Sequence, residues 1–452
     1  TEHIKRFTPE ELPIYKREYT TAFMQFDKYF LFIQRGFELL KPSGVLGYII
    51  PSKFAKVGAG KNLRKLLSEE KAVEKIISFG ANQVFKDKTT YTCILLLKKD
   101  ENDSLLYHEV ENLNNWKVKN YSIEFDDVEY PNLDENTWVL MPNHLKPIFN
   151  SISEQSIKLV DLIGNENIFN GIQTSDNRIY VHYPTNEDDD YLYFNLDGAE
   201  WKVEKELTRP YFQTSRGIDN LNTYRILNPN SFVIYPYKNE NGRINFVNIE
   251  TLHSEYPETF RFFENYSEEL KKRDIKPEPE TNEEWYRFGR HQSLEKCDVP
   301  AKIVVGVLSQ GDKYAIDTSH TFISSGGTAG YCMITLPENF PYSIYYIQAL
   351  LNSKYCEWFA SLHGEVFRDG FIARGTKVLK KLPIKKVDFE NEVEKELHDN
   401  ISRIQRELIQ LQGNIDENQN NNRRLTPLQR RFSQKKTELD NLLKELYNLG
   451  ED

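Results

Sequence analysis

Few residues in this chain have the type and spacing needed for chemistry, and none forms a complete hydrolytic or redox site. No Gly-x-Ser-x-Gly motif occurs, and no two histidines have metal-binding spacing. Glu269–Lys271 matches only the second half of a nuclease motif, because no Pro-Asp precedes it. Asp188–Asp190 lies in a loop rich in Asn, Glu and Asp, and we interpret it as a solvated turn. The sequence therefore predicts no metal site.

The segment Gly58–Lys61 places two glycines and a lysine at the expected start of a helix. Free backbone amides at such a position can hold a phosphate. The alternative is a simple turn that leads into the helix. Two glycines alone do not decide between an anion site and a turn.

Alternating helices and strands must position the residues of the first hundred positions. Apolar side chains at Phe30, Ile33, Phe37 and Leu40 predict a helix over 27–40. Apolar runs then predict a strand over 45–50 that is covered on both faces, a helix over 58–67, and strands over 75–79 and 90–97. Since no helix separates the last two strands, we expect an antiparallel hairpin at the edge of an otherwise parallel α/β sheet.

The remaining chain divides by composition into three segments. Residues 111–145 are polar, acidic and turn-rich, which predicts a linker with short embedded strands after a first domain over 1–110. Short β-like runs within 146–388 predict a loop-rich α+β domain; these runs are 178–183, 231–235 and 302–305.

The C-terminal segment 389–452 repeats apolar residues at spacings of three and four, from Val393 to Ile415, which predicts a helix in coiled-coil register. Thr426-Pro427 predicts an N-cap and first-turn proline for a second helix, after a loop over 416–424. We therefore expect an antiparallel helical hairpin. It could dimerise, pack on the preceding domain or contact DNA.

Composition excludes several classes of protein. With 452 residues, 39% hydrophobic and 13% aromatic, the chain is too apolar to be disordered and long enough for two or three domains. The net charge of −10 argues against a protein that coats nucleic acid indiscriminately, but it permits one basic cleft. Four scattered cysteines suggest neither a disulfide framework nor a zinc knuckle, and no apolar run is long enough to cross a bilayer. We expect a cytoplasmic protein with no membrane partner.

Four blocks in the first hundred residues carry a family resemblance, in this order and spacing: Asp27–Phe32, Leu39–Pro51, Leu63–Arg64 and Val84–Thr92. They resemble the second half of the catalytic domain of adenine-N6 DNA methyltransferases of the gamma motif order. Single-chain type IIG restriction-modification enzymes share this class. The resemblance spans residues 15–100 and implies the C-terminal half of a Rossmann-like methyltransferase sheet.

The resemblance also implies what is missing. In that family, S-adenosylmethionine binds over a glycine-rich strand end, and an Asn-Pro-Pro-Tyr loop holds the flipped adenine. No Pro-Pro occurs in this chain, and no Phe-x-Gly-x-Gly precedes residue 15. We therefore expect a fragment of a longer bacterial enzyme that uses S-adenosylmethionine, with no cofactor bound to the fragment and no methylation by the fragment alone.

One aromatic residue receives a role from the resemblance. A base taken out of the duplex must be recaptured by stacking and by hydrogen bonds to its edge. In the family, the stacking aromatic lies in the block that Val84–Lys88 matches, which assigns Phe85 as the platform for the flipped adenine. The alternative is that Phe85 belongs to the core of the strand hairpin.

The 146–388 segment resembles the target-recognition domain of the same enzymes, through the blocks Asn170–Asn177, Leu207–Phe212, Trp285–Arg290, Leu350–Lys354 and Leu382–Ile384. Such a domain presents cations to phosphates and donors to base edges. The candidate DNA-binding residues are Lys61, Lys86, Lys88, Arg209, Arg216, Arg287, Arg290, Arg368, Arg374 and Lys377. We prefer them to the basic residues of the C-terminal helices, although any of them could be an ordinary solvated charge.

These patterns lead to one main hypothesis and two alternatives. The main hypothesis is sequence-specific binding of double-stranded DNA as part of an adenine-N6 methyltransferase of a restriction-modification system, with a nuclease possible upstream. One alternative is a free-standing DNA- or protein-binding specificity module. The other is a phage-defence methyltransferase without a nuclease. The target sequence and the oligomeric state do not follow from the sequence.

Overall fold

The computed structural model describes residues 9–85, 90–100, 102–118, 123–213, 221–240, 243–311, 313–327, 330–367 and 370–447. The chain divides into two compact units. Unit 1 contains the described residues up to Glu154 together with Trp358–Ala373, and unit 2 contains Gln155–Glu357 and the described residues from Arg374 onward. Each unit has its own hydrophobic core. The sequence pattern had placed Trp358–Ala373 with the second domain.

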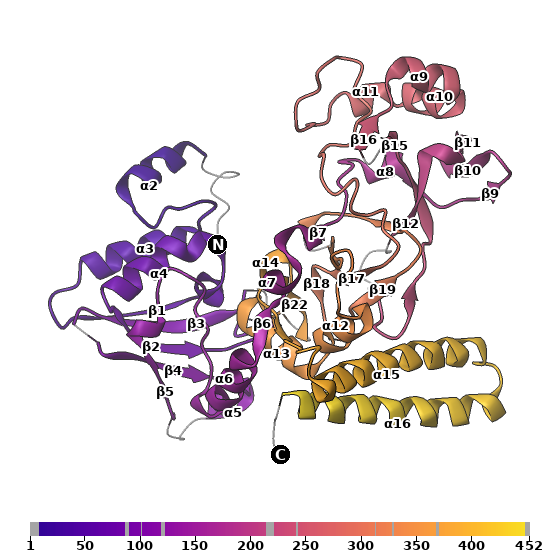
Figure 1. Ribbon diagram of the computed structural model, residues 1–452. Helices are drawn as coiled ribbons and strands as arrows, with labels where there is room; N and C mark the ends of the chain where they lie inside the picture. Colours follow the sequence, from indigo (N-terminus) through magenta and orange to yellow (C-terminus); the bar gives the residue numbers. More distant parts are fainter. Residues whose placement is uncertain are drawn as a thin grey trace. The chain divides into compact units, whose positions relative to one another are not determined.

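Unit 1 is built on a five-stranded sheet of order β1-β3-β2-β4-β5 (Figure 1). Its strands are β1 (Val45–Pro51), β2 (Val73–Ser78), β3 (Thr92–Lys98), β4 (Ser104–Glu109) and β5 (Asp126–Glu129). β3 pairs antiparallel with β1 and with β2, β2 pairs parallel with β4, and β4 pairs antiparallel with β5. The predicted antiparallel pairing of β2 and β3 is confirmed, but the pair does not lie at the edge of the sheet, because β3 lies between β1 and β2. The expectation of an otherwise parallel sheet is wrong for the described residues, where only β2 and β4 pair in parallel.

Short helices cover the sheet of unit 1. They are α2 (Leu12–Glu18), α3 (Lys28–Glu38), α4 (Lys61–Glu69), α5 (Leu113–Val118) and α6 (Lys146–Glu154), with 3-10 turns η1 (Pro9–Glu11), η2 (Ser52–Ala55), η3 (Gly58–Gly60), η4 (Tyr130–Asn132) and η5 (Asn143–Leu145). The predicted helix α3 is confirmed, and its buried side chains Phe30, Ile33 and Phe37 have helical spacing. After it, Ser43 adopts a positive φ of 58° and the Gly44 amide donates to the Lys41 carbonyl, which closes the turn into β1.

Strand β1, at the edge of the sheet, is more exposed than the sequence predicts. Ile50 is 5% exposed, but Val45 is 56% exposed and Ile49 48% exposed. The prediction of a strand covered on both faces is therefore wrong in this chain, because no described residue covers the face that bears Val45 and Ile49. The segment predicted as a linker contains a short strand, as expected, but this strand, β5, pairs with β4 as part of the unit 1 sheet.

Unit 2 contains two larger sheets, of order β13-β19-β17-β21-β7 and β20-β12-β14-β8. The strands of the first are β7 (Ile168–Asn170), β13 (Ile226–Leu227), β17 (Lys302–Gly306), β19 (Ala315–Asp317) and β21 (Tyr331–Ile334); those of the second are β8 (Val181–His182), β12 (Thr208–Phe212), β14 (Ser231–Ile234) and β20 (Phe322–Ile323). Smaller pairings involve β6 (Ser156–Lys158) with β23 (Pro383–Lys385), β9 (Asn186–Glu187), β10 (Tyr191–Leu196) and β11 (Ala199–Glu204) together, and β15 (Tyr237–Glu240) with β16 (Arg243–Phe246).

The helices of unit 2 surround these sheets. They include α7 (Leu159–Ile163), α8 (Asn177–Tyr180), α9 (Ile249–Glu255), α10 (Pro257–Asn265), α11 (Ser267–Leu270), α12 (Ile344–Leu351), α14 (Thr376–Leu379), α15 (Glu392–Glu417) and α16 (Asn422–Leu446). The predicted strands over 231–235 and 302–305 are confirmed as β14 and β17. The predicted strand over 178–183 is confirmed only at β8; residues 178–180 belong to α8, because the Asp176 side chain accepts from the Ile179 amide and caps a helical turn there.

The C-terminal helices α15 and α16 lie side by side in unit 2 (Figure 1). Ile401, Ile404, Leu408 and Leu411 are buried along α15 at spacings of three and four. α16 begins at Asn422, four residues before the predicted N-cap at Thr426. The reason is that the Asn421 side chain accepts from the Arg424 amide and caps the helix first, which leaves Pro427 inside it.

Candidate nucleic-acid interface

Phe85 follows β2 in unit 1 and is 45% exposed. The start of its loop is fixed, because the Asn82 side chain donates to the Phe79 and Val110 carbonyls at 3.0 and 2.9 Å. Val84 packs partly against the small cluster that contains Phe79 and Val110. The exposure of Phe85 does not fit the alternative in which it is a core residue.

Arg64 shapes the turn at Gly58–Lys61 by donating to the Phe54 and Val57 carbonyls at 2.6 and 2.9 Å, and two amides of the turn are bonded within it. The Gly60 amide donates to the Val57 carbonyl, and the Lys61 amide donates to the Gly58 carbonyl. A side chain at Gly60 would meet the Phe54 carbonyl at 2.3 Å, so glycine is required by close packing. The structure supports the simple turn. Lys61 remains exposed, with its ammonium 3.8 Å from Glu135.

A cavity of about 640 Å³ lies in unit 1 at the carboxyl ends of the codirectional strands β1, β2 and β4. Its lining includes Ser52, Ser78, Tyr91, Glu109 and Phe367. In open α/β sheets, the carboxyl ends of the strands are the usual place for a ligand.

Lys56 is one of the basic residues that line this cavity. Its ammonium donates to the carbonyls of Ser361 and Gly364 at 2.6 and 2.9 Å, and burial lowers its pKa to about 8. Burial also raises the pKa of Glu365, which lines the same cavity. Lys56 thus binds the backbone at the C-terminal end of helix α13 (Lys354–His363).

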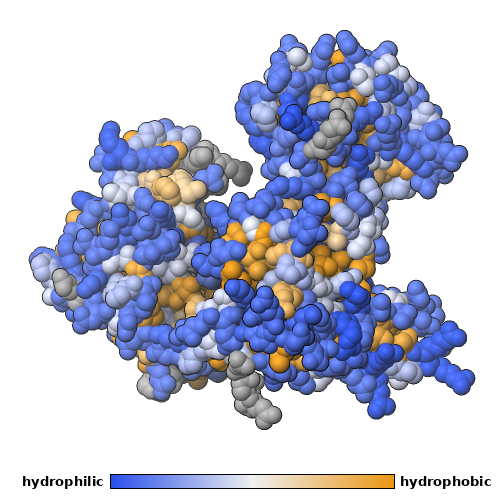
Figure 2. Space-filling view, viewed as in Figure 1, coloured by the Kyte–Doolittle hydropathy of each residue, from blue (hydrophilic) through white to orange (hydrophobic). Residues whose placement is uncertain are grey.

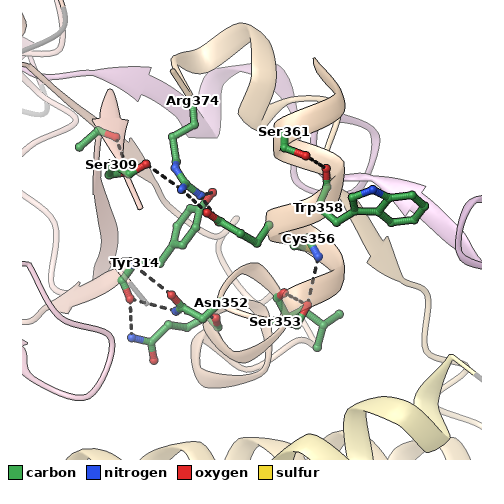
Figure 3. Close-up of polar contacts among 12 residues, drawn as sticks. Ser309, Tyr314, Asn352, Ser353, Cys356, Trp358, Ser361 and Arg374 are labelled. Atoms are coloured by element: carbon green, nitrogen blue, oxygen red, sulfur yellow. Dashed lines mark hydrogen bonds and ion pairs between the residues drawn. The ribbon is translucent and has the colours of Figure 1, made fainter. Parts of the chain in front are cut away.

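Arg374 in unit 2 was predicted to contact DNA, and its position in the structure speaks against that role. It is fully buried, and its guanidinium donates to both carboxylate oxygens of Glu357 at 2.6 and 2.8 Å and to the Ser309 carbonyl at 3.0 Å (Figure 3). The ring of Tyr314 lies against the same guanidinium. The structure contradicts a DNA contact by Arg374, because its charge is already paired in the interior.

Three other predicted arginines of unit 2 bind neighbouring groups of the protein. Arg287 is 9% exposed and forms an ion pair with Glu284, so the structure also speaks against Arg287 as a DNA contact. Arg290 donates to the Asp274 carboxylate at 2.8 Å and is about one-third exposed. Arg209 donates to two nearby backbone carbonyls and lies over the Tyr235 ring. Arg290 and Arg209 retain exposed surface for a ligand.

The remaining predicted residues fall into two groups. Lys377 is exposed on α14, and within the part of the chain that the structure describes it has no ion-pair partner. Lys86, Lys88, Arg216 and Arg368 lie outside the described residues.

The sequence pattern gave low weight to the basic residues of α16. Between Glu417 and Glu438 the sequence has no acidic residue and six basic ones: Arg423, Arg424, Arg430, Arg431, Lys435 and Lys436. The four arginines are exposed. An acid-free run of this length in a chain of net charge −10 was the signal that could have identified this helix.

Two classes of site are not found in the described ranges. No helix there combines the length and the apolar character that crossing a bilayer requires. No cluster of three or more His, Cys, Asp or Glu side chains has an arrangement that could hold a metal ion, within the same ranges. The four cysteines are all buried and unpaired, and burial raises the pKa of Cys93 and Cys297 to about 12.

Two family models match the chain. Residues 2–85 match the Eco57I restriction-modification methylase family, and residues 215–384 match the TaqI-like C-terminal specificity domain. The first range ends at Phe85, and the second lies inside the segment 146–388. The resemblance to the methylase and target-recognition parts of type II restriction-modification enzymes is confirmed.

Two relatives agree with these matches. The chain is 48% identical to the type II restriction enzyme and methyltransferase RM.Eco57I of Escherichia coli, over 100% of this chain and 45% of that protein. It is 24% identical to the type II methyltransferase M.BstVI of Geobacillus stearothermophilus, over 60% of this chain and 47% of that protein. The chain thus spans about half the length of these relatives.

One solved structure shares the fold. The type IIL restriction-modification enzyme MmeI, determined in complex with DNA, aligns with a TM-score of 0.56 and 11% identity, over 98% of this chain and 52% of that one. At this identity the likeness concerns the fold alone.

Proposed function

Because this chain is similar over its whole length to RM.Eco57I, we propose that it is part of a type II restriction-modification enzyme. In that enzyme it supplies the far half of the DNA methyltransferase domain and the domain that recognises the DNA target. The observation that carries the proposal is the 48% identity, together with a methylase match and a specificity-domain match in the same order along the chain.

The exposed edge of unit 1 supports the view that its sheet continues in a longer protein. Val45 and Ile49 on β1 are about half exposed, and β1 pairs only with β3 among the described strands. Edge strands of stable sheets are usually blunted by charges, prolines or a covering element. An apolar edge with one bare face is therefore consistent with a sheet that is completed by chain outside these 452 residues.

Base flipping gives Phe85 its proposed role in the parent enzyme. The acceptor would be an adenine amino group, as in the adenine-specific methyltransferases that this chain resembles. An exposed aromatic ring at the end of the methylase match can stack on an extrahelical base, and such stacking offsets the cost of unstacking the duplex. Phe85 would be the stacking platform, and the missing loop would bind the base edge.

S-adenosylmethionine would be the methyl donor of the parent enzyme. The glycine-rich strand end that binds it in the family this chain resembles is not found here, because no Phe-x-Gly-x-Gly precedes residue 15. We therefore place the cofactor outside this chain and assign no step to it here.

DNA binding by this chain can be tested without knowing the target. Duplexes that bind the 452-residue chain would be selected from a random pool and sequenced. We expect one enriched motif, with Lys61, Arg209, Arg290 and Lys377 as candidate contacts. Recovery of no motif, together with no retention of duplex DNA, would contradict the proposal.

A methyl-transfer assay tests the proposal that this chain is only part of the enzyme and does not methylate DNA alone. The parent protein, with its upstream sequence restored, should transfer a labelled methyl group to a duplex that carries the selected motif. The 452-residue chain alone should not. Robust turnover by the chain alone would show that its catalytic content is misread.

Phe85 can be tested by 2-aminopurine fluorescence in the parent protein. With the probe at the target base, the wild type should give a strong rise on binding, and Phe85→Ala should change that signal while Phe85→Trp retains stacking. An unchanged signal in Phe85→Ala would remove the assigned role.

An alternative function for the parent protein is a phage-defence methyltransferase, which would use the same DNA-binding chain but lack a nuclease. The similarity to RM.Eco57I, which is named as both a restriction enzyme and a methyltransferase, favours the fused enzyme. Cleavage of a duplex with the selected motif by the parent protein distinguishes the two.

A further inference from the structure

The first half of α16 concentrates positive charge on its solvent face. Arg423 and Arg430 are seven residues apart, as are Arg424 and Arg431, so each pair spans two helical turns, or roughly 10 Å at 1.5 Å per residue. At 100° per residue, Arg423 and Arg430 lie opposite the side of the helix that bears Phe432 and Leu439. Arg424 and Arg431 both lie about 100° to one side of them. The four side chains therefore form one strip along the exposed face.

This arginine strip is not neutralised by the protein. Lys435, on the same helix, forms ion pairs with Glu407 and Glu438 at 3.3 and 2.8 Å. None of the ion pairs found among the described residues involves Arg423, Arg424, Arg430 or Arg431. Hydrophilic residues cover the free end of the helix pair (Figure 2). Four adjacent unpaired guanidinium groups repel one another and are stabilised by a polyanion.

The helix pair is fixed to the rest of unit 2. Arg225 donates to both carboxylate oxygens of Asp416 at 2.6 and 2.7 Å, and the Tyr224 ring packs edge-on against Phe432. Gln405 of α15 donates to the Gln348 side chain at 3.0 Å in the interior. Arg225, Tyr224 and Gln348 all lie inside the specificity-domain match over 215–384. The arginine strip thus has a defined position relative to the recognition domain.

We propose that the arginine strip of α16 binds the phosphate backbone of double-stranded DNA, outside the bases that are read. This inference rests on the proposed function, because it takes DNA to be the ligand of unit 2. Guanidinium groups bind phosphate oxygens bidentately, and the regular charge of the duplex matches a straight row of cations. The apolar side of α16 already packs against α15, so the strip is the face that remains for a partner. Its contribution is to affinity and orientation, without sequence information.

The test measures how binding depends on salt. The 452-residue chain would be titrated against a fluorescent mixed-sequence DNA duplex, and against the duplex selected from the random pool, over a range of salt concentrations. The variants are Arg430→Gln with Arg431→Gln, and the same pair changed to Lys. Glutamine keeps a helix propensity close to that of arginine, and circular dichroism checks that the helices persist.

The matched control removes two positive charges from the same helix pair. Lys395 and Lys444 each have carboxylates as near neighbours in sequence, so neither is expected to face a phosphate. Lys395→Gln with Lys444→Gln therefore changes the net charge as the test variant does, at positions off the arginine strip.

We expect the glutamine pair to reduce the slope of log affinity against log salt by up to about 2, since each lost phosphate contact removes about 0.9. At about 0.15 M salt this corresponds to a 10- to 30-fold loss of affinity, equal for both duplexes. The lysine pair should keep most of the affinity, and the control should leave the slope unchanged.

Three results would overturn the inference. The first is an unchanged slope of log affinity against log salt in the glutamine pair. The second is a loss of affinity in the control equal to that in the glutamine pair. The third is a loss of affinity for the selected duplex alone. Tighter binding of single-stranded RNA than of duplex, lost in the same variants, would assign the strip to RNA instead. If the wild type binds duplex DNA and the variants match it, only this inference fails. If the wild type binds no DNA, the proposed function fails with it.

Discussion

Strands β1 and β17 are both short and apolar, yet they have opposite environments. In unit 1, β1 lies at a sheet edge and leaves Val45 and Ile49 about half exposed. In unit 2, β17 is central and every one of its residues is buried, including Lys302, which pairs with Asp317 in the interior. Unit 2 thus buries its own apolar surface, whereas unit 1 leaves part of it open. The difference shows that an apolar run in the sequence does not by itself tell whether its strand is central or at a sheet edge.

The largest expected effect comes from the buried ion pair of unit 2. Asp317→Ala leaves the Lys302 ammonium buried without its partner and also removes the acceptor for the Thr321 amide and hydroxyl. We expect the free energy of unfolding of unit 2 to fall by about 3–5 kcal/mol. Hydrogen exchange of unit 2 peptides measures this without assuming that the two units unfold together. The exposed pair Lys271–Glu268 is the control, and Lys271→Ala should cost less than about 1 kcal/mol.

The next effect compares two neighbours on β1. Ile50→Ala removes a buried side chain from the unit 1 core and should cost about 3 kcal/mol. Ile49→Ala removes the same atoms from a half-exposed position, so in this chain it should cost about 0.5 kcal/mol or less. Hydrogen exchange of unit 1 peptides gives both values. In the parent protein, Ile49→Ala should lower the free energy of unfolding of unit 1 as much as Ile50→Ala does. If Ile49→Ala still costs about 0.5 kcal/mol or less there, the bare face of β1 is not covered by further chain.

The third effect separates two basic residues that are three positions apart in unit 2. Arg374→Met leaves Glu357 and the Ser309 carbonyl without their partner and should destabilise unit 2 by about 2 kcal/mol. Lys377→Gln should leave stability unchanged and weaken DNA binding about fivefold, if it contacts a phosphate. Thermal unfolding and DNA titration of both variants test this contrast. A stable Arg374→Met variant that loses DNA binding would restore Arg374 as a contact.

The smallest effect is a pH dependence confined to unit 2. Burial lowers the pKa of His182 to about 4, so His182 is neutral in the folded state while the unfolded chain binds a proton below about 6.5. Stability contributed by neutral His182 is therefore present above pH 6.5 and is lost as the pH falls toward 4. Between about pH 6.5 and 5 the loss should reach about 1–2 kcal/mol.

His182→Phe tests this dependence, because it keeps a ring against Phe194 and removes the titrating group. Unit 2 of this variant should lose less stability on acidification than the wild type. Unit 1 peptides should show no difference between the two proteins. An identical acid dependence in unit 2 would show that His182 does not stay neutral.

The sequence determined the local elements of this protein. Apolar spacing predicted α3, β14 and β17, and the family blocks identified a methylase part followed by a recognition part. These patterns succeed because helical and strand periodicity, turn residues and motif order are properties of adjacent positions. The failures at this level were also local, such as α8, where a single capping side chain outweighed a run of β-forming residues.

Only the tertiary structure decided which residues face solvent. Arg374 and Lys377 look alike in sequence, but Arg374 forms an ion pair with Glu357, 17 residues away, and donates to the Ser309 carbonyl, 65 residues away. The bare face of β1 depends likewise on which segments pack over it, and no local pattern reports that. Whether a cation is available to DNA depends on charges brought near it by folding. The arginine strip of α16 remains available because folding brings none of the chain's many carboxylates into an ion pair with it among the described residues.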